Sequence, residues 1–497
     1  MRRSLAAIAA LLMFASGASA TPAASSMPVR EQVLRDQLDA IGNLAEQGDL
    51  PAALRAADAA LAAAGEDSVA EAALLAMRVG LLTGLRRDAE TVTATETMIA
   101  KGYIVDPQML TTAADAAART AQPLQVAAML TVYARRFPQS VNSLRWEFVA
   151  AAMGDLRSPD TTAALQSFAL ALFDAGYRCD SDLGGVRFME RQAMDGLVAG
   201  SRIAEARSRL ADVTSIENLA GMAVDRRFEA LWPTLEGLLG DHLVPATRRD
   251  LARIRQAFDA DQDNLLIRQS YVRRLTWLGD PARAVALSEH ILTNPAEIAA
   301  GGRYGWWLVV AHADALGVAG DPQGGLQRYR QLNAAIPRGN GVRIDALVDE
   351  ATFAARAGLP LDAVQSADIA LATDGVSGFG KMQLWQAKAC ALHRLGRDTE
   401  TAPIIARIDA DPMQNRDAYV DAMLCLGQLD RAEAVVLSSL GDPERRTDIL
   451  LKLQQLVFDK HDRALAPAMA ALASRPAVAS AIIAYGRQLP QPLRPAY

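Results

Sequence analysis

The stretch from Trp277 to Pro295 reads WLGDPARAVALSEHILTNP. Gly279 permits a tight turn after one helix, because a residue without a Cβ adopts positive φ at little cost. Ala284, five places later, is small enough to let a second helix pack closely against the first. Pro295 disfavours helix in the residue before it and is expected to end that second helix. The stretch therefore predicts an antiparallel helix hairpin.

The same pattern of a glycine followed five places later by a small residue recurs along the chain. The further copies are Gly48 with Ala53, Gly84 with Ala89, Gly358 with Ala363 and Gly427 with Ala432, and two weaker ones are Gly320 with Gly325 and Gly396 with Ala402, one place late. Within each run of copies, successive glycines lie 31 to 41 residues apart. A period of about 30 to 40 residues with two helices per unit indicates a helical solenoid.

Composition favours the same all-α class. Apolar residues make up 51% of the 497 residues but aromatic ones only 5%. The apolar content is mostly Ala and Leu, which favour helix over strand. A chain of this length is too long for one ordinary compact domain, so either several domains or one elongated repeat array is expected.

In these features the chain resembles the tetratricopeptide repeat family, whose unit of about 34 residues has a turn after its first helix, a small residue and a closing proline. WLGDPARAVALSEHILTNP and EQGDLPAALRAADAAL match best, and Trp385, eleven residues before Gly396, matches the aromatic position of the first helix. The tyrosine that usually follows Gly-Asp is Leu or Pro here, most copies lack the proline, and unit length varies. The resemblance implies a right-handed α-solenoid of antiparallel helix hairpins with degenerate repeats, and a protein or peptide partner.

The N-terminus has the three-part layout of a secretory signal peptide. Two arginines precede an apolar run from Leu5 to about Ala15, and Ala18-Ser19-Ala20 follows. Cleavage is expected after Ala20, with export of a bacterial protein to the periplasm. The apolar run is shorter than the roughly 20 residues of a membrane span, and no later segment is apolar enough to be one, so no integral membrane segment is expected after cleavage.

Six segments follow from these patterns. They are a signal peptide (1–20), an N-terminal helical-repeat segment (21–176), an irregular helical middle segment (177–262), a C-terminal helical-repeat segment (263–449), a helical cap (450–488) and a Pro-rich, extended tail (489–497). The middle segment opens with YRCDSDLGGVRF, which shows no helical period. A cap is expected because a solenoid must cover its terminal helix pair.

The chain has three cysteines, Cys179, Cys390 and Cys425. This number permits at most one disulfide. Cys390 and Cys425 fall on the first helices of neighbouring predicted hairpins, so a bridge between them is one alternative in an oxidising compartment. Their positions within the hairpin differ by about one helical turn, which favours the other alternative, buried free thiols.

Charge and motifs point to no nucleic acid, cofactor or metal. The net charge is −6, which gives no electrostatic footprint for nucleic acid. GVSGFGKM (375–382) fits Gly-x4-Gly-Lys, but Met382 stands where a phosphate-binding loop needs Ser or Thr, so an inter-repeat loop is expected. The five histidines show no metal-ligand spacing, and no Gly-x-Ser-x-Gly motif marks a hydrolase nucleophile.

RYGWW concentrates aromatic residues and an arginine at the start of a predicted first helix. Arg303, Tyr304, Trp306 and Trp307 form the candidate binding surface, because Trp, Tyr and Arg dominate binding energy on a concave face. Aromatic rings of this kind also stack on sugars. The alternative reading, which we favour, places one Trp in the hairpin core with the other covering it.

The leading functional hypothesis is an exported, non-enzymatic scaffold that binds a protein or peptide in the cell envelope. This hypothesis rests on analogy with the fold. The first alternative is an accessory subunit of polysaccharide export that binds glycan. The second is a helical cell-wall enzyme, which would place a carboxyl group with a raised pKa in a deep pocket.

Overall fold

The computed structural model describes residues 29–64, 68–179, 183–290, 292–337, 341–454 and 463–493. The predicted signal peptide and the last four residues lie outside these ranges. The chain forms two compact units: unit 1 comprises residues up to Cys179 together with Gln192–Gly196, and unit 2 comprises Asp180–Arg191 together with Leu197–Tyr497. Each unit is described by itself.

Unit 1 consists of helices joined by short turns. Its helices are α2 (Val29–Glu46), α3 (Leu50–Ala64), α4 (Ser68–Gly84), α5 (Asp88–Ala100), α6 (Pro107–Arg119), α7 (Pro123–Arg136), α8 (Trp146–Asp155) and α9 (Thr162–Asp174), with 3-10 turns η1 (Pro138–Ser143) and η2 (Pro159–Thr161). Each helix from α2 to α7 packs against the next one in the chain, as antiparallel hairpins require.

Unit 2 includes most of α10 (Leu183–Ala199), of which Gln192–Gly196 groups with unit 1. Its irregular first part holds α11 (Ile203–Arg209), η3 (Leu210–Asp212), α12 (Ile216–Val224), η4 (Arg226–Leu231), α13 (Trp232–Leu239), η5 (Asp241–Leu243) and α14 (Val244–Ala260). Regular hairpins follow: α15 (Leu265–Trp277) with α16 (Pro281–Glu289), α18 (Gly302–Val318) with α19 (Pro322–Ala335), α20 (Gly341–Arg356) with α21 (Pro360–Leu371), α22 (Gly378–Arg394) with α23 (Asp398–Asp409), and α24 (Arg416–Cys425) with α25 (Leu429–Gly441).

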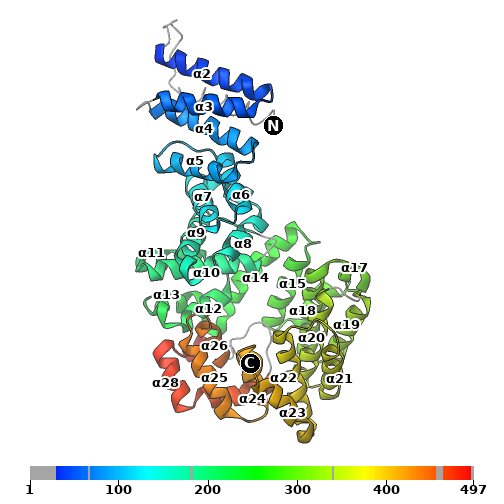
Figure 1. The fold of residues 1–497 in the computed structure, drawn as a ribbon. Coiled ribbons are helices and arrows are strands. Elements are labelled where there is room, and N and C mark those ends of the chain that lie inside the picture. The colour runs from blue at the N-terminus through cyan, green and yellow to red at the C-terminus, as the bar shows by residue number, and fades with distance from the viewer. Residues whose placement is uncertain are drawn as a thin grey trace. The chain divides into compact units, whose positions relative to one another are not determined.

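The predicted all-α fold of repeated helix hairpins is confirmed. Within the described ranges the only strand-like pairing is a single bridge between Asp225 and Gly486. The first helices of successive hairpins, α15, α18, α20, α22 and α24, pack against one another, and each also packs against its own second helix (Figure 1). This side-by-side stacking of hairpins is the architecture of a helical solenoid.

Left-handed backbone at one residue ends the first helix of most hairpins. Six of the seven predicted turn glycines have φ between 70° and 94°. At Gly279, the Gly279 amide donates to the Thr276 carbonyl and the Asp280 amide to the Leu275 carbonyl. The same pair of bonds recurs at Gly48, Gly320, Gly396 and Gly427, and at Gly358 the Leu359 amide donates to the Ala354 carbonyl. This pair of bonds is the Schellman motif, which satisfies the last carbonyls of a helix.

The prediction for the turn at Gly84 is wrong by two residues. Gly84 is the last residue of α4, and Arg86, with φ of 59°, adopts the left-handed turn conformation. The small residue five places later is then Thr91, which is fully buried, whereas the predicted Ala89 is exposed.

Two further hairpins have no glycine at the turn and were not predicted from the glycine pattern. Ala121, between α6 and α7, and Ser201, between α10 and α11, have φ of 53° and 57° and make the same two backbone bonds. The signal was weak there because only glycine marks such a turn reliably in a sequence.

The residue five places after the turn is buried at every regular hairpin, because it lies where the two helices are closest. At Gly325 an added Cβ would lie 2.7 Å from Phe353 Cζ and 2.9 Å from the Ala313 carbonyl oxygen, so this turn needs a second glycine. After Gly396 the buried residue is Thr401 and not the predicted Ala402, which is exposed. The repeat at Gly396 is therefore in register after all.

The predicted role of Pro295 is also wrong. The second helix of that hairpin, α16, already ends at Glu289, and Pro295 is the first residue of the short helix α17 (Pro295–Ala300). Proline suits this position because the first amide of a helix has no intrahelical acceptor.

Two segments predicted to be irregular are ordered. Helix α10 begins at Leu183, so the second half of YRCDSDLGGVRF is helical, while residues 180–182 lie outside the described part. Residues 489–493 are the described part of the predicted extended tail, and they pack within unit 2: Leu489 and Leu493 are buried, and Gln491–Leu493 form a 3-10 turn, η7. The Leu489 amide donates to Gln454 Oε1 at 2.6 Å.

The last helices of unit 2 pack against its first ones. Helix α26 (Arg446–Leu453) packs against α12, while α28 (Pro476–Tyr485) packs against α25 and η4, with α27 (Ala466–Ala473) beside α26 (Figure 1). Buried Asp225 receives hydrogen bonds from Arg227 at 2.6 Å and from Thr447 of α26 at 2.7 Å. The helices of unit 2 thus form a closed ring, whereas an open array with a terminal cap was predicted.

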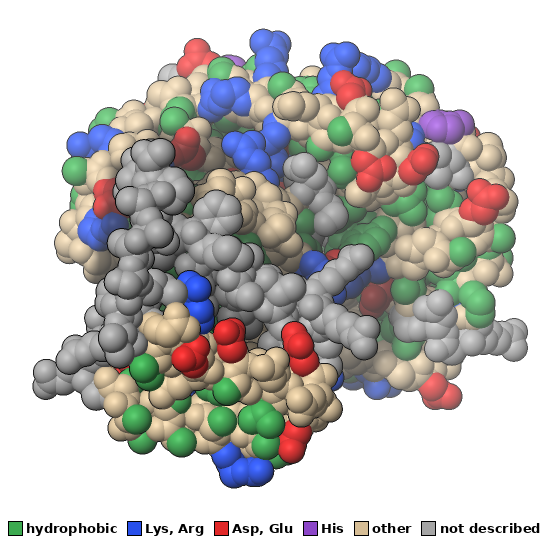
Figure 2. All heavy atoms as spheres, turned by 90° about the horizontal axis from the view of Figure 1, so that it is seen from above, with side chains coloured by type: hydrophobic (Ala, Val, Ile, Leu, Met, Phe, Trp, Pro, Cys, Tyr) green, Lys and Arg blue, Asp and Glu red, His purple; other side chains and the backbone are tan. Residues whose placement is uncertain are grey.

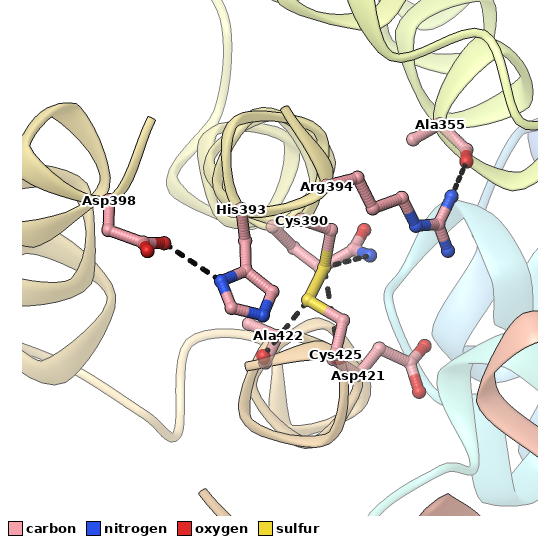
Figure 3. Close-up of a disulfide and its surroundings, with 9 residues drawn as sticks. Ala355, Cys390, His393, Arg394, Asp398, Asp421, Ala422 and Cys425 are labelled. Carbon is pink, nitrogen blue, oxygen red and sulfur yellow. Dashed lines mark hydrogen bonds and ion pairs between the residues drawn. A yellow bond between two sulfur atoms is a disulfide. The ribbon is translucent and has the colours of Figure 1, made fainter. Parts of the chain in front are cut away.

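A disulfide joins the first helices of two neighbouring hairpins. Cys390 on α22 and Cys425 on α24 are bridged, with their Cα atoms 5.7 Å apart (Figure 3). The favoured prediction of free thiols is wrong for this pair. Helix α22 packs directly against α24, and the two cysteines meet although their positions within the hairpin differ by about one helical turn. Cys179 is buried and does not take part in a disulfide.

Acidic and basic side chains are interspersed on the molecular face that Figure 2 shows. Among the described helices, no single one is long and apolar enough to span a bilayer; α27 and α28 reach the required length and hydropathy only together, and they are bent by 78° at their junction.

Candidate functional site

RYGWW lies in the first turn and a half of α18, and its residues divide between core and surface. Trp306 is 2% exposed, and its indole Nε1 donates a hydrogen bond to Asp349 Oδ2 at 3.1 Å. It packs against the buried ring of Tyr329 with ring centres 5.2 Å apart. Trp306 therefore belongs to the core and not to the predicted binding surface.

The other three residues form an exposed group, which we call the aromatic lip: Arg303, Tyr304 and Trp307. Tyr304 is 41% exposed and Trp307 37%. Their rings meet edge to face at 5.8 Å, and the Arg303 guanidinium lies 5.8 Å from one ring centre and 5.6 Å from the other. The three side chains support one another, which presents aromatic surface with little loss of side-chain freedom on binding.

Trp307 also lines a pocket of about 330 Å³ in unit 2. The pocket lies against α10, α12, α14, α15, α18 and α20. Its charged lining residues are Arg187, Glu217, Asp250, Arg253, Arg273, Arg274, Asp314 and Asp349. Apolar side chains, among them Ile254, Leu266 and Val310, complete the wall. The pocket therefore combines an apolar wall with an unusual density of charge.

Five of these charges form an alternating ladder in the order Arg187, Glu217, Arg274, Asp250, Arg253. The separations between successive nitrogen and oxygen atoms are 3.4, 2.7, 2.5 and 3.2 Å. The ladder joins α10, α12, α15 and α14. Its centre is buried: the Asp250 and Arg274 side chains are 1% and 10% exposed. Buried charges of this kind are tolerated only when they are well paired.

The ladder fixes the charge states of its members. Burial by itself raises the pKa of Glu217, but Arg274 and Arg187 outweigh it and lower that pKa to about 2. Burial and the nearby charges of Arg274 and Arg187 lower the pKa of Arg273 to about 10. Glu217 is consequently ionised at neutral pH, so it is unsuited to act as a general acid.

Local capping positions the ladder helices. Asn264 begins α15 by accepting hydrogen bonds from the Leu266 and Ile267 amides, both at 3.2 Å. Ser215 begins α12 by accepting from the Asn218 amide, and it donates to Glu217 Oε2 at 2.9 Å. The caps set where each helix begins and hence which side chains face the pocket.

The sequence prediction missed the ladder. Its signal is visible once the hairpins are aligned on their turn residues. Five places before the turn, the other regular hairpins of unit 2 have Ala315, Phe353, Ala391 and Ala422, all buried. The corresponding residue before Gly279 is Arg274. A charged residue at a core position of a repeat requires a buried partner, and this indicates a site.

The structure brings Ser288, His312 and Glu289 together, although no motif predicted it. Ser288 Oγ lies 2.8 Å from His312 Nδ1, and Glu289 Oε2 lies 3.1 Å from Nε2 but not in hydrogen-bond geometry. Ser288 and His312 are both fully buried, and burial lowers the pKa of His312 to about 4. A substrate cannot reach this serine, so the group acts as a packed polar contact.

The segment GVSGFGKM (375–382), which partly matches a phosphate-binding loop, has a structural role. Gly375 forms the turn after α21 with φ of 86°, and Ser377 accepts the Gly380 amide at 3.1 Å to begin α22. Helix α22 therefore begins at Gly378, inside the segment that was predicted to be an inter-repeat loop. Met382 is buried in the hairpin core. In the part of the chain that the structure describes, no group of three or more His, Cys, Asp or Glu side chains could hold a metal ion.

No protein-family model matches the chain, and no curated protein matches it in sequence. Among solved structures, a chain in the structure of Naa15/Naa10 bound to HypK-THB is similar, with 15% sequence identity over 96% of this chain and 72% of that chain. The TM-score is 0.29, so this similarity carries no argument. The assignment to the helical-repeat class rests on the hairpins, turns and packing of the chain itself.

Proposed function

We propose that the protein is an exported, non-enzymatic helical-repeat scaffold that binds a protein or peptide partner through the aromatic lip. The observation that carries the proposal is the exposure of Tyr304 and Trp307 on a first helix, with Arg303 against both rings. Tyr, Trp and Arg supply most of the binding energy at protein interfaces. A soluble protein gains nothing in stability from leaving two such rings in water.

The disulfide supports the location in the cell envelope. Disulfides persist in oxidising compartments and are rare in the cytosol, and Cys390 and Cys425 are bridged. Together with the N-terminal pattern of a signal peptide, this favours the periplasm. Cell fractionation followed by N-terminal sequencing tests the location: a mature chain in the periplasm should begin at Thr21.

Affinity capture with matched variants tests the binding role. Purified protein is used as bait for envelope extract, and a captured partner is then produced and titrated directly. Tyr304→Ala combined with Trp307→Ala should weaken binding at least about tenfold, since each anchor commonly contributes more than about 1 kcal/mol. Phe379→Ala is the control, because Phe379 is an aromatic residue at the start of α22 that is more exposed, at 52%, than either ring of the lip.

Equal binding by the wild type and the double variant would contradict the role of the lip. Turnover of a cell-wall polymer with no captured partner would overturn the scaffold proposal in favour of an enzyme. Capture of polysaccharide, lost in the same double variant, would support the glycan-binding alternative, because exposed aromatic rings also stack on sugars.

A further inference from the structure

The charged residues that line the pocket balance one another. The lining holds four arginines and four carboxylates: Arg187, Arg253, Arg273, Arg274, Glu217, Asp250, Asp314 and Asp349. Their formal charges cancel, so the lining as a whole attracts neither an anion nor a cation. A charged ligand that entered the pocket would lose its hydration without gaining an unpaired counter-charge. The pocket therefore favours an uncharged ligand.

The ladder presents hydrogen-bond donors and acceptors in alternation. Its arginines only donate, its carboxylates only accept, and successive members lie 2.5 to 3.4 Å apart. A ligand group that lies against the ladder therefore meets a donor and an acceptor side by side. A hydroxyl group both donates and accepts, whereas a carboxylate only accepts and an ammonium group only donates. The alternation accordingly favours a ligand with hydroxyl groups.

Gln269 adds an uncharged polar group to the same wall. It lies on the face of α15 that also presents Ser270 and Arg274 to the pocket. The Gln269 residue is 7% exposed, and its Oε1 accepts a hydrogen bond from Ser270 Oγ at 3.3 Å. Among the described residues its Nε2 has no acceptor. A donor on a side chain this deeply buried is costly to leave unpaired, and a ligand oxygen in the pocket would pair it.

We propose that this pocket binds a neutral, polyhydroxylated ring, namely a single pyranose sugar, either free or at the end of a chain. The hydroxyl groups are inferred from the balanced charges, the alternating ladder and Gln269. The ring is inferred from the other wall, where Trp307 offers an aromatic face and Ile254, Leu266 and Val310 offer apolar contact to C–H groups. A volume of about 330 Å³ is at the lower end for small-molecule sites and too small for a folded partner.

This sugar site is independent of the partner surface proposed above, although Trp307 belongs to both. Arg303 and Tyr304 of the aromatic lip are not among the described residues that line the pocket, and Gln269 is not part of the lip. A change at Gln269 therefore tests the sugar site by itself.

Ligand-observed NMR titration of the purified protein, without any partner, tests the proposal in mildly acidic buffer, where glucosamine is protonated. The neutral probes are D-glucose, D-galactose, D-mannose and N-acetyl-D-glucosamine. Glucuronate and glucosamine are the charged counterparts, and N-acetylglycinamide is an uncharged amide without hydroxyl groups. At least one neutral sugar should bind at least about fivefold more tightly than each of these three compounds.

The two methyl glycosides of the sugar that binds best distinguish the two sources of the ring. Retention of binding by one of them indicates the end of a chain, because its anomeric oxygen is substituted as in a polysaccharide. Loss of binding by both indicates a free sugar.

Two pocket variants with matched controls assign the binding to the pocket. Gln269→Leu should weaken sugar binding at least about fivefold through lost hydrogen bonds, and Gln365→Leu is its control because Gln365 is exposed on α21 and does not line the pocket. Trp307→Ala should weaken it by at least about the same factor through loss of the aromatic face, with Phe379→Ala as its control. Circular dichroism confirms that each variant is folded.

Loss of sugar binding in Gln269→Leu and Trp307→Ala, with retention in both controls, would establish the site. Three outcomes would overturn it: no neutral sugar binds, a charged counterpart or the amide binds as tightly as the best sugar, or folded Gln269→Leu and Trp307→Ala bind like the wild type. None of these outcomes bears on the aromatic lip, whose readout is the retention of a captured partner by the Tyr304 and Trp307 double variant. Gln269→Leu should retain that partner.

Discussion

Left-handed backbone at a single residue turns each hairpin, and the identity of that residue differs among the copies. Glycine adopts this conformation at little cost, whereas a residue with a Cβ is strained by roughly 1 kcal/mol. Ala121 and Ser201 nevertheless adopt it, with φ of 53° and 57°. The surrounding helix packing must supply the free energy that these two residues cost.

Replacing Ala121 by glycine is therefore expected to stabilise unit 1 by about 0.5 to 1 kcal/mol. The same replacement at Ala118, an exposed residue near the end of α6, should destabilise by a similar amount because it falls within a helix. Urea unfolding of both variants measures the difference. Loss of stability in Ala121→Gly would show that the turn conformation is not strained.

The ionised state of Glu217 makes stability depend on pH. Its pKa is held at about 2 in the folded state, below the ordinary value of 4.5. The resulting stabilisation is fully present above about pH 4.5 and is lost as the pH falls towards 2. The shift corresponds to roughly 3 kcal/mol of unfolding free energy.

Glu217→Gln should remove most of that loss between pH 4.5 and 2, while lowering stability at pH 7 because Arg274 and Arg187 lose a partner. Chemical unfolding at a series of pH values measures both effects. Glu205→Gln is the control, since Glu205 forms an exposed pair with Arg202 on α11. An unchanged pH profile in Glu217→Gln would contradict the buried ladder.

At the scale of helices, the position of a residue relative to the turn of its hairpin explains whether it belongs to the apolar core or to the charged pocket. In the regular hairpins of unit 2, the residue five places before the turn is buried, and in all but one it is Ala or Phe. Arg274 departs from this rule and is compensated by Glu217 and Asp250 from α12 and α14. The irregular first part of unit 2 thus supplies the partners that the regular hairpin needs.

The disulfide between α22 and α24 is expected to stabilise unit 2. It closes a loop of 35 residues, which restricts the unfolded chain by about 2 to 4 kcal/mol. Reduction with dithiothreitol should lower the midpoint of denaturant unfolding accordingly. The variant with serine at both Cys390 and Cys425 should unfold at that lower midpoint, and dithiothreitol should not change it. A midpoint that dithiothreitol lowers equally in wild type and variant would rule out a role for this bridge.

At the scale of unit 2, closure of the ring depends on the C-terminal residues. The Arg487 amide donates to the Val224 carbonyl at 3.0 Å, and its guanidinium donates to the Ala223 carbonyl and to Glu236 at 2.7 and 2.5 Å. An added Cβ at Gly486 would lie 2.3 Å from the Val224 carbonyl oxygen. Only glycine allows this approach of the two backbones.

Arg487→Ala should loosen the ring at its closure. Each lost bond to the side chain is worth about 0.5 to 3 kcal/mol, so amide hydrogen exchange in α12 and α26 should become at least several-fold faster. Arg475→Ala is the control, because Arg475 pairs with Asp430 and Glu433 of α25. Its effect should be confined to α25 and α28. Unchanged exchange in α12 of Arg487→Ala would show that the tail does not hold the ring closed.

Sequence by itself determined the helical class, the hairpin unit and most of its turns. Gly279 and Ala284 could be interpreted without any tertiary information, because turn and close helix contact depend on residues a few places apart. The same local rule placed the turn at Arg86 two residues too early, at Gly84, and the glycine pattern did not mark the turns at Ala121 and Ser201.

Only the tertiary structure decided the ring, the disulfide and the pocket. Asp225 meets Thr447 across more than 200 residues, and the ladder draws its charges from four helices. The aromatic lip was partly predictable, since RYGWW stands out in composition, but the separation of Trp306 from Trp307 depends on which side of α18 the next hairpin covers. Contacts between distant segments are set by the packing of whole helices. A pattern that repeats every 30 to 40 residues does not specify which repeats contact one another.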